Sequence, residues 1–398
     1  MDIDWKEVSE YMKRLPRGFN YILLLQTIPI LIVSSMLVNE IKPALFHKQM
    51  IYYIVGAIAF TVSAFIPWSK ILWWFAPVSY FFNLMLLMAV EVVGHKILGA
   101  QRWIKLPGVG LTIQPSEFIK VSVVLMLAFL IMRKPPPENG YGFIDFVKLS
   151  IVIIIPFLLI AKEPDLGTGL VLLLTGYGIL FVVGINWKVT TTILLAIILT
   201  APILYSQLKP YQKKRINDFL NKPSYHVRQA LIAIGSGGIK GKKENEATQT
   251  QLKFLPIASS DFIFAYLGER LGFTGMVSIV GLYILLIIHL LRISYIYSDD
   301  YLIVSIASGL AFLFFIYMDV NIYMIIGLAP VVGVPLPMFS HGGTSFIIFS
   351  VFFGILVNLI ATKGYTVYNS DTKLTMMQKD EIRDSHILSR RQKRKVKS

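Results

Sequence analysis

Long apolar runs constrain this chain more than any other feature of its sequence. About ten segments, most of them 18 residues or longer, are mostly apolar, and a helix of that length crosses a hydrocarbon layer about 30 Å thick. Because lipid offers no hydrogen-bond partner, a backbone that crosses it must pair its own polar groups, which favours helices. The runs are too long and too continuously apolar for the strands of an outer-membrane barrel. The sequence therefore predicts an all-α, polytopic membrane protein with about ten transmembrane helices.

The apolar runs also divide the chain. A single membrane domain is expected over residues 20–362, between an N-terminal segment, 1–19, and a basic tail, 363–398; a long loop covers about 207–260. We expect helices over residues 20–38, 50–66, 71–94, 115–132, 144–161, 167–184, 188–206, 271–292, 301–319 and 341–361.

Lys and Arg set the expected orientation. The two termini and the short connections on their side carry nineteen of these residues, against six in the short connections on the other side. The positive-inside rule then puts both termini in the cytoplasm and the long loop outside, since long loops translocate largely regardless of charge. The net charge of +15 is accordingly attributed to the Lys and Arg residues that face the cytoplasm and contact anionic membrane lipids. No nucleic-acid partner is expected.

Residue types exclude several chemistries. The chain has no cysteine, so disulfides, thiolate metal sites and cysteine nucleophiles are excluded. The six histidines show no metal-ligand spacing. The adjacent Ser340 and His341 lack the nucleophile elbow of a hydrolase, and that interpretation is rejected.

Ionisable side chains in or near the hydrocarbon layer are the functional candidates. Each costs free energy there unless it pairs with another group or contacts water. Glu117 and Lys120 lie three residues apart, on one helix face, and are able to pair. They form either a structural ion pair or a charged floor for an anionic head group. Asp165 is placed to cap the helix that follows it, yet Lys162, Glu163 and Asp165 together carry more charge than a turn needs.

Two later segments add candidates. The long loop contains Arg215 and then a glycine-rich stretch, Ile234 to Gly241, in which backbone amides beside Lys240 would be able to approach phosphate, although a flexible turn has the same composition. Asp261 follows the loop at the mouth of an apolar segment, either as a helix cap or as a functional carboxylate. Three prolines between residues 330 and 337 forbid a regular helix, so this segment and Ser340 are expected to line a wet cavity.

Taken in order, these segments resemble the SEDS family (shape, elongation, division and sporulation). The matching segments are Arg102 to Ile104, Gln114 to Lys120, Glu163 to Thr168, Tyr211 to Ile216, Ile234 to Gly241, Leu255 to Pro256, Asp261 to Phe264 and Gly327 to Ser345. Ile234 to Gly238 and Thr248 to Pro256 look like the RodA branch. The chain departs from the family pattern at Glu269-Arg270, where two glutamates are usual, and at His341, where a tyrosine is usual.

The resemblance implies a function. SEDS proteins polymerise lipid II, a polyprenyl-pyrophosphate-linked disaccharide pentapeptide, into glycan strands outside the cytoplasmic membrane. In the RodA branch this serves cell elongation and rod shape, beside a class B penicillin-binding protein and other elongasome proteins. The family's essential aspartate matches Asp261, and its Glu/Lys pair matches Glu117 and Lys120. Two alternatives stay open: a lipid II flippase, and a non-catalytic scaffold for the penicillin-binding protein.

The chemistry can be assigned to residues. The acceptor hydroxyl needs a base, for which a carboxylate serves, and the pyrophosphate leaving group needs positive charge. Asp261 is the predicted base, and Arg102, Lys105, Lys120, Arg215 or Lys240 would lie near the phosphates. The full expected substrate-binding set is Arg102, Glu117, Lys120, Asp165, Arg215, Lys240 and Ser340. A divalent cation such as Mg²⁺ is left open as a cofactor.

Overall fold

The computed structural model describes residues 18–97, 100–105, 112–163, 165–206, 213, 217, 219, 224–247, 249, 254–255 and 258–363. The predicted terminal segments lie almost wholly outside these residues. In chain order the elements are α2 (Tyr21–Ile41), α3 (Pro43–Phe65), α4 (Trp68–Val93), β1 (His95–Ile97), β2 (Ala100–Lys105), β3 (Thr112–Ile113), α5 (Pro115–Arg133), α6 (Phe143–Lys162), α7 (Leu166–Val183), α8 (Trp187–Ser206), α10 (Tyr225–Gly237), the 3-10 helix η2 (Glu244–Glu246), α12 (Ile263–Ile296), α13 (Tyr301–Ile325) and a last helix, Gly343–Lys363.

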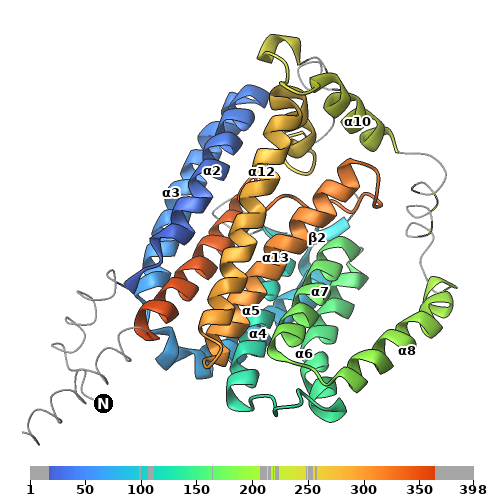
Figure 1. Cartoon of the computed structure of the whole chain (residues 1–398). Helices are drawn as coiled ribbons and strands as arrows, with labels where there is room; N and C mark the ends of the chain where they lie inside the picture. Colours follow the sequence, from blue (N-terminus) through green and yellow to red (C-terminus); the bar gives the residue numbers. More distant parts are fainter. Residues whose placement is uncertain are drawn as a thin grey trace, which may run out of the picture.

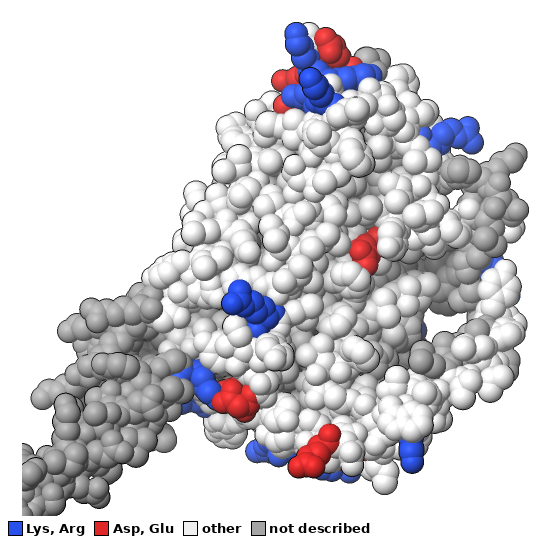
Figure 2. Space-filling model, viewed as in Figure 1, with Lys and Arg blue, Asp and Glu red and all other residues white. Residues whose placement is uncertain are grey.

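The predicted helical membrane fold is confirmed. Nine helices within the described ranges are long and apolar enough to cross a membrane, and each matches a predicted segment. The tenth segment is α8, whose apolar part, Trp187–Thr200, is shorter. Figure 2 shows a broad face with few charged side chains between charged groups near its two ends, as expected for a surface in contact with lipid.

Helix α13 is the centre of the bundle. It packs against α5, α7 and α12 (Figure 1), and 83% of its most apolar window is buried, against 22% for α3 at the edge. Side-chain caps set several helix starts: the carboxylate of Asp300 accepts hydrogen bonds from the amides of Leu302 and Ile303 at the start of α13. Helix α8 leans away from its neighbours (Figure 1).

Helix α12 differs from its prediction. It begins at Ile263, before the expected residue 271, and contains a break at Gly272 with φ 64° and ψ −164°. Only glycine adopts this backbone readily. A helix of 34 residues is about 50 Å long at 1.5 Å per residue, well beyond the hydrocarbon layer. The break therefore separates a long membrane helix from a short first segment, Ile263 to Leu271.

The long loop is also more structured than predicted. It contains α10 and η2, which lie at the end of the bundle where α2 ends and α12 begins (Figure 1); we name this the α10 end. Helix α10 packs along α12. The three-stranded antiparallel sheet β1-β2-β3 connects α4 to α5.

Candidate functional site

Polar and charged side chains from four helices meet near the end of α13 that faces the α10 end. Lys120, one turn into α5, lies 2.7 Å from Glu117 and donates a hydrogen bond to the hydroxyl of Tyr317 on α13. Its ammonium also lies 4.6 Å from the centroid of the Tyr317 ring. The Lys120 side chain is 4% exposed and that of Glu117 14%. The predicted ion pair is thus confirmed, and it is almost fully desolvated.

A second cluster surrounds Asp165. The predicted cap is confirmed, since Asp165 Oδ1 accepts from the amide of Thr168 at the start of α7. The same carboxylate lies 3.4 Å from Arg102 Nη1, and its Oδ2 accepts from Gln114 Nε2 at 3.1 Å. Arg102 Nε also donates to the carbonyl of Glu163. Asp165 is 3% exposed. Its buried carboxylate therefore joins the start of α7 and the start of α5 to strand β2, where Arg102 balances its charge.

Asp261 does not cap α12. The residue in the cap position is Phe262, with no side-chain hydrogen bond to the helix, so the interpretation of Asp261 as a cap is wrong. Its main-chain carbonyl accepts from Asn321 Nδ2 at 2.9 Å. Asn321 is fully buried on α13 and donates as well to the carbonyl of Val334. A residue with no capping role is therefore held in place through its backbone.

The irregular segment after α13 completes the site. Its lack of helix is confirmed: the backbone from Gly327 to Phe339 is turn and coil. Ser340 Oγ donates to the carbonyl of Ser260 at 2.7 Å, and the amide of His341 donates to the carbonyl of Ser259 at 2.9 Å. A Cβ placed on Gly333 would lie 3.4 Å from Asp261 Oδ2, and the neighbouring Val332 packs against Gly167 of α7.

The Val332–Val334 segment thus lies against both Asp261 and Gly167, two residues after Asp165, and the carboxylates of Asp165 and Asp261 interact electrostatically. Burial raises the pKa of the Asp261 carboxyl, a hydrogen bond with Ser260 opposes this rise, and the negative charge of Asp165 adds to it. A carboxylate with a raised pKa is a better general base near neutral pH. On α13, Tyr317 and Asn321 are four residues apart and so share a face, which places the Lys120 and Asp261 clusters about one helical turn from each other.

Three of the predicted cations are not placed in this site. Arg215 and the side chain of Lys105 lie outside the described residues. Lys240 is exposed in the turn after α10, and among the described contacts none joins it to Asp261. The glycine-rich stretch packs instead on the break of α12: the amide of Phe273 donates to the carbonyl of Gly238 at 2.9 Å. The structure thus gives this stretch a packing role, and its approach to phosphate stays a prediction.

Sequence reasoning missed Tyr317, Asn321 and Glu40. The first two lie inside an apolar run, where only their polarity at membrane depth was a signal. Glu40 pairs with Arg270, the residue that departs from the family pattern; a charge at the end of the first apolar run was available as a clue.

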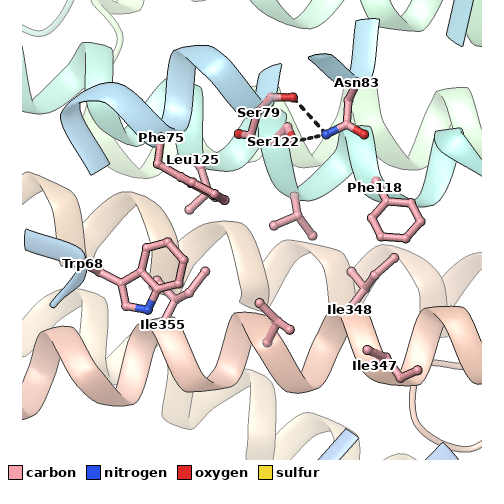
Figure 3. A pocket seen from close by; sticks show the side chains of 12 residues that line it. Trp68, Phe75, Ser79, Asn83, Phe118, Ser122, Leu125, Ile347, Ile348 and Ile355 are labelled. Carbon is pink, nitrogen blue, oxygen red and sulfur yellow. Dashed lines mark hydrogen bonds between the residues drawn. The ribbon is translucent and has the colours of Figure 1, made fainter. Parts of the chain in front are cut away.

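An apolar cavity of about 190 Å³ lies between α4, α5 and the helix Gly343–Lys363. Figure 3 shows Trp68, Phe75 and Phe118 on its walls, with Asn83 hydrogen-bonded to Ser122 at 2.8 Å and to the carbonyl of Ser79. The cavity-lining residues Phe118 and Val121 are the chain neighbours of Glu117 and Lys120 on α5. The described residues contain no group of three or more metal-ligand side chains close enough to hold an ion.

Comparisons with known proteins agree with this arrangement. The model of the FtsW, RodA and SpoVE family, described as cell cycle proteins, matches residues 18–365. A peptidoglycan glycosyltransferase MrdB of Helicobacter pylori (strain ATCC 700392 / 26695) is 47% identical over 359 residues, covering 90% of this chain and 94% of the relative. The MrdB of Escherichia coli (strain K12) is 37% identical over 314 residues, covering 77% and 82%.

Solved structures are similar as well. A chain from a peptidoglycan synthase complex that coordinates polymerization and crosslinking superposes with a TM-score of 0.72 at 26% identity, covering 86% of this chain and 97% of that one. The rod shape determining protein RodA of Thermus thermophilus superposes with a TM-score of 0.65 at 25% identity, covering 86% and 96%.

Proposed function

Because the chain belongs to the FtsW, RodA and SpoVE family of cell cycle proteins, we infer that it is a peptidoglycan glycosyltransferase that polymerises glycan strands during cell elongation. Its nine membrane-crossing helices within the described residues make it a polytopic membrane protein. The observation that carries the catalytic assignment is the partly buried Asp261 carboxylate, which has no capping role and interacts with Asp165.

The proposed substrate is lipid II. The GlcNAc 4-hydroxyl of the acceptor attacks the anomeric carbon of the donor MurNAc, a glycosidic bond forms, and the bond to polyprenyl pyrophosphate breaks. Asp261 takes the hydroxyl proton as general base. The pyrophosphate leaves as a stable anion and needs no acid, in contrast to most glycosidases, which use two carboxylates.

Arg102 and Lys120 are the proposed electrostatic partners of the pyrophosphate. Arg102 presents a planar fork of N–H donors suited to phosphate, and Lys120 a buried ammonium. Glu117, Asp165 and Ser340 hold these groups and the Asp261 loop in place through the contacts described above. The apolar cavity beside Phe118 is proposed to take part of the polyprenyl chain, since its lining is almost wholly hydrocarbon.

A divalent cation stays a prediction. Mg²⁺ keeps several waters and is commonly held by one or two carboxylates together with substrate phosphates, so the pair Asp165 and Asp261 is compatible with it only when a phosphate is bound. No step here depends on the ion, and polymerisation with and without EDTA tests the requirement. A class B penicillin-binding protein is the proposed partner, supported by the likeness to a chain of a synthase complex.

Purified protein in liposomes with lipid II tests the proposal. Polymer formation supports a transferase, transbilayer movement of lipid II alone indicates a flippase, and neither indicates a scaffold. Asp261→Asn should make no detectable polymer, because asparagine takes no proton at neutral pH; the base contributes about 10²–10⁴-fold to rate.

Folding of the Asp261→Asn protein is the necessary control. A carboxyl whose folded-state pKa is raised costs stability in its charged form, and this cost is present above that pKa and vanishes as the pH falls below the unfolded-state value. Asp261→Asn should therefore unfold at neutral pH no more easily than the wild-type protein. Near-normal polymerisation by the folded variant would remove Asp261 from the mechanism.

A further inference from the structure

A second charged cluster lies at the α10 end, outside the proposed catalytic site. Glu40, in the last turn of α2, accepts from Arg270 Nε at 2.6 Å through one oxygen and from Arg270 Nη2 at 2.7 Å through the other. Tyr266 donates to Glu40 as well, at 2.7 Å. The side chains of Glu40 and Arg270 are 10% and 13% exposed. This is a bidentate ion pair, a contact that fixes angle as well as distance.

Arg270 belongs to the short first segment of α12. The break at Gly272 interrupts the helix, so the long membrane helix does not by itself dictate the direction of residues 263–271. The turn after α10 is seated on this break: Arg270 Nη1 donates to the carbonyl of Lys242, and the amide of Lys242 donates to the carbonyl of Glu269 at 3.0 Å. Arg270 thereby ties the segment both to this turn and, through Glu40, to α2.

The opposite end of the same segment carries Asp261. Residues 262–269 are all buried, so the segment moves as one packed unit. Among the described residues, hydrogen bonds to the main-chain carbonyls of Ser259, Ser260 and Asp261 tie its beginning to the segment after α13 and to Asn321. A change of tilt at Arg270 would thus be transmitted along the rigid helical turns to the position of the Asp261 carboxylate.

Resting on the proposed function, we propose that Glu40 and Arg270 are a positioning pair for the reaction. They set the tilt of the 263–271 segment and with it the place of Asp261 relative to Asp165 and the acceptor hydroxyl. Neither residue touches the reacting atoms. A misplacement of about 1 Å can cost about 100-fold in rate, which is why an ion pair remote from the chemistry matters here.

Steady-state polymerisation by variants that are purified and normalised for folded protein tests this role. Arg270→Gln should lower kcat by about 10- to 100-fold with little change in KM. Arg270→Lys keeps the positive charge but loses the two parallel hydrogen bonds of the guanidinium. Its kcat should therefore lie between those of the wild type and Arg270→Gln. The exchange Glu40→Arg with Arg270→Glu should recover part of the lost kcat. Lys134→Gln, which removes the ion pair with Asp145 at the other end of the bundle, is the control and should leave kcat unchanged.

A geometric readout separates positioning from stability. Because the chain has no cysteine, Ser259→Cys with His341→Cys introduces the only thiols, at two residues joined by a main-chain hydrogen bond, a spacing compatible with a disulfide. The pair should oxidise readily in the otherwise wild-type chain and more slowly once Arg270→Gln is added.

The outcomes are distinguishable. Unchanged kcat and unchanged oxidation in Arg270→Gln, or a loss confined to the amount of folded protein, would overturn the positioning role while leaving Asp261 as the base. Full activity of Asp261→Asn would instead overturn the proposed function.

Discussion

The surroundings of Asp261 suit it to the role proposed for it. An exposed aspartate titrates near pH 3.9 and is a weak base. Here burial is the main cause that raises the pKa of its carboxyl, and the negative charge of Asp165 raises it further. A hydrogen bond with Ser260 lowers the pKa and so opposes part of this rise. The carboxylate is not used as a cap of α12, since the capping position is occupied by Phe262.

Replacing Asp165 by asparagine tests this electrostatic link. Asparagine caps a helix about as well as aspartate, so the start of α7 should persist. Loss of the negative charge, and release of Arg102 from its partner, both favour the charged form of Asp261 and lower its pKa. Since the base must be deprotonated, the acidic limb of the pH profile of kcat/KM should move to lower pH.

The matched control is Asp299→Asn, which removes an exposed carboxylate whose pKa is lowered chiefly by its hydrogen bond with Lys363. That variant should leave the acidic limb where it is. An unmoved limb in Asp165→Asn, at retained activity, would mean that the two carboxylates are not coupled.

At the scale of elements, α13 holds the site together. Tyr317 binds Lys120 of α5, and Asn321, one turn later, binds the carbonyls of Asp261 and Val334. Because α13 is buried on nearly all sides, these polar groups have no access to lipid and must find partners within the protein. The element that crosses the middle of the bundle thus determines the spacing of the two charged clusters.

The Lys120–Glu117 pair yields the prediction at this scale. Lys120→Ala leaves the Glu117 carboxylate without its partner at 14% exposure, which costs roughly 3–5 kcal/mol for a fully buried pair. We expect a lower thermal midpoint and lost polymerisation. Adding Glu117→Gln to Lys120→Ala should recover most of the midpoint but not the activity, if Lys120 also binds pyrophosphate. Recovery of both in the double variant would make the pair purely structural.

At the scale of the whole molecule, the bundle separates two charged ends by a broad face with few charged side chains (Figure 2). The site lies toward the α10 end, where α2 ends and both α5 and α12 begin (Figure 1). The positive-inside rule assigns this end to the outside of the membrane, the side on which glycan strands are proposed to grow.

Reporter fusions test this orientation. A cytoplasm-dependent reporter fused after Ser398 should be active, and one inserted near Glu244, in η2 at the α10 end, should be inactive. A reporter that works only outside should show the opposite pattern. The reverse result for both would place the proposed site in the cytoplasm, away from the growing strand.

The sequence by itself determined the membrane fold, the approximate places of the predicted helices apart from the early start of α12, and the Glu117–Lys120 pair, because each depends on hydrophobicity or on spacing within one helix. It also predicted Asp165 as a cap, which is confirmed; the role of Asp261 as base, which the resemblance implies, stays a prediction. The fold, the helices, the ion pair and the cap are local properties, so neighbouring residues are enough to specify them.

Only the tertiary structure decided which distant groups meet. Glu40 and Arg270 are 230 residues apart, and Lys120 and Tyr317 are 197 apart; no periodicity relates such positions. The sequence likewise did not predict the break at Gly272 or the packing of the glycine-rich turn on it. Glycine occurs both in flexible loops and where two backbones approach closely, so its presence does not distinguish the two. Contacts between side chains of different helices depend on how the helices pack, and the sequence of a single helix does not determine this packing.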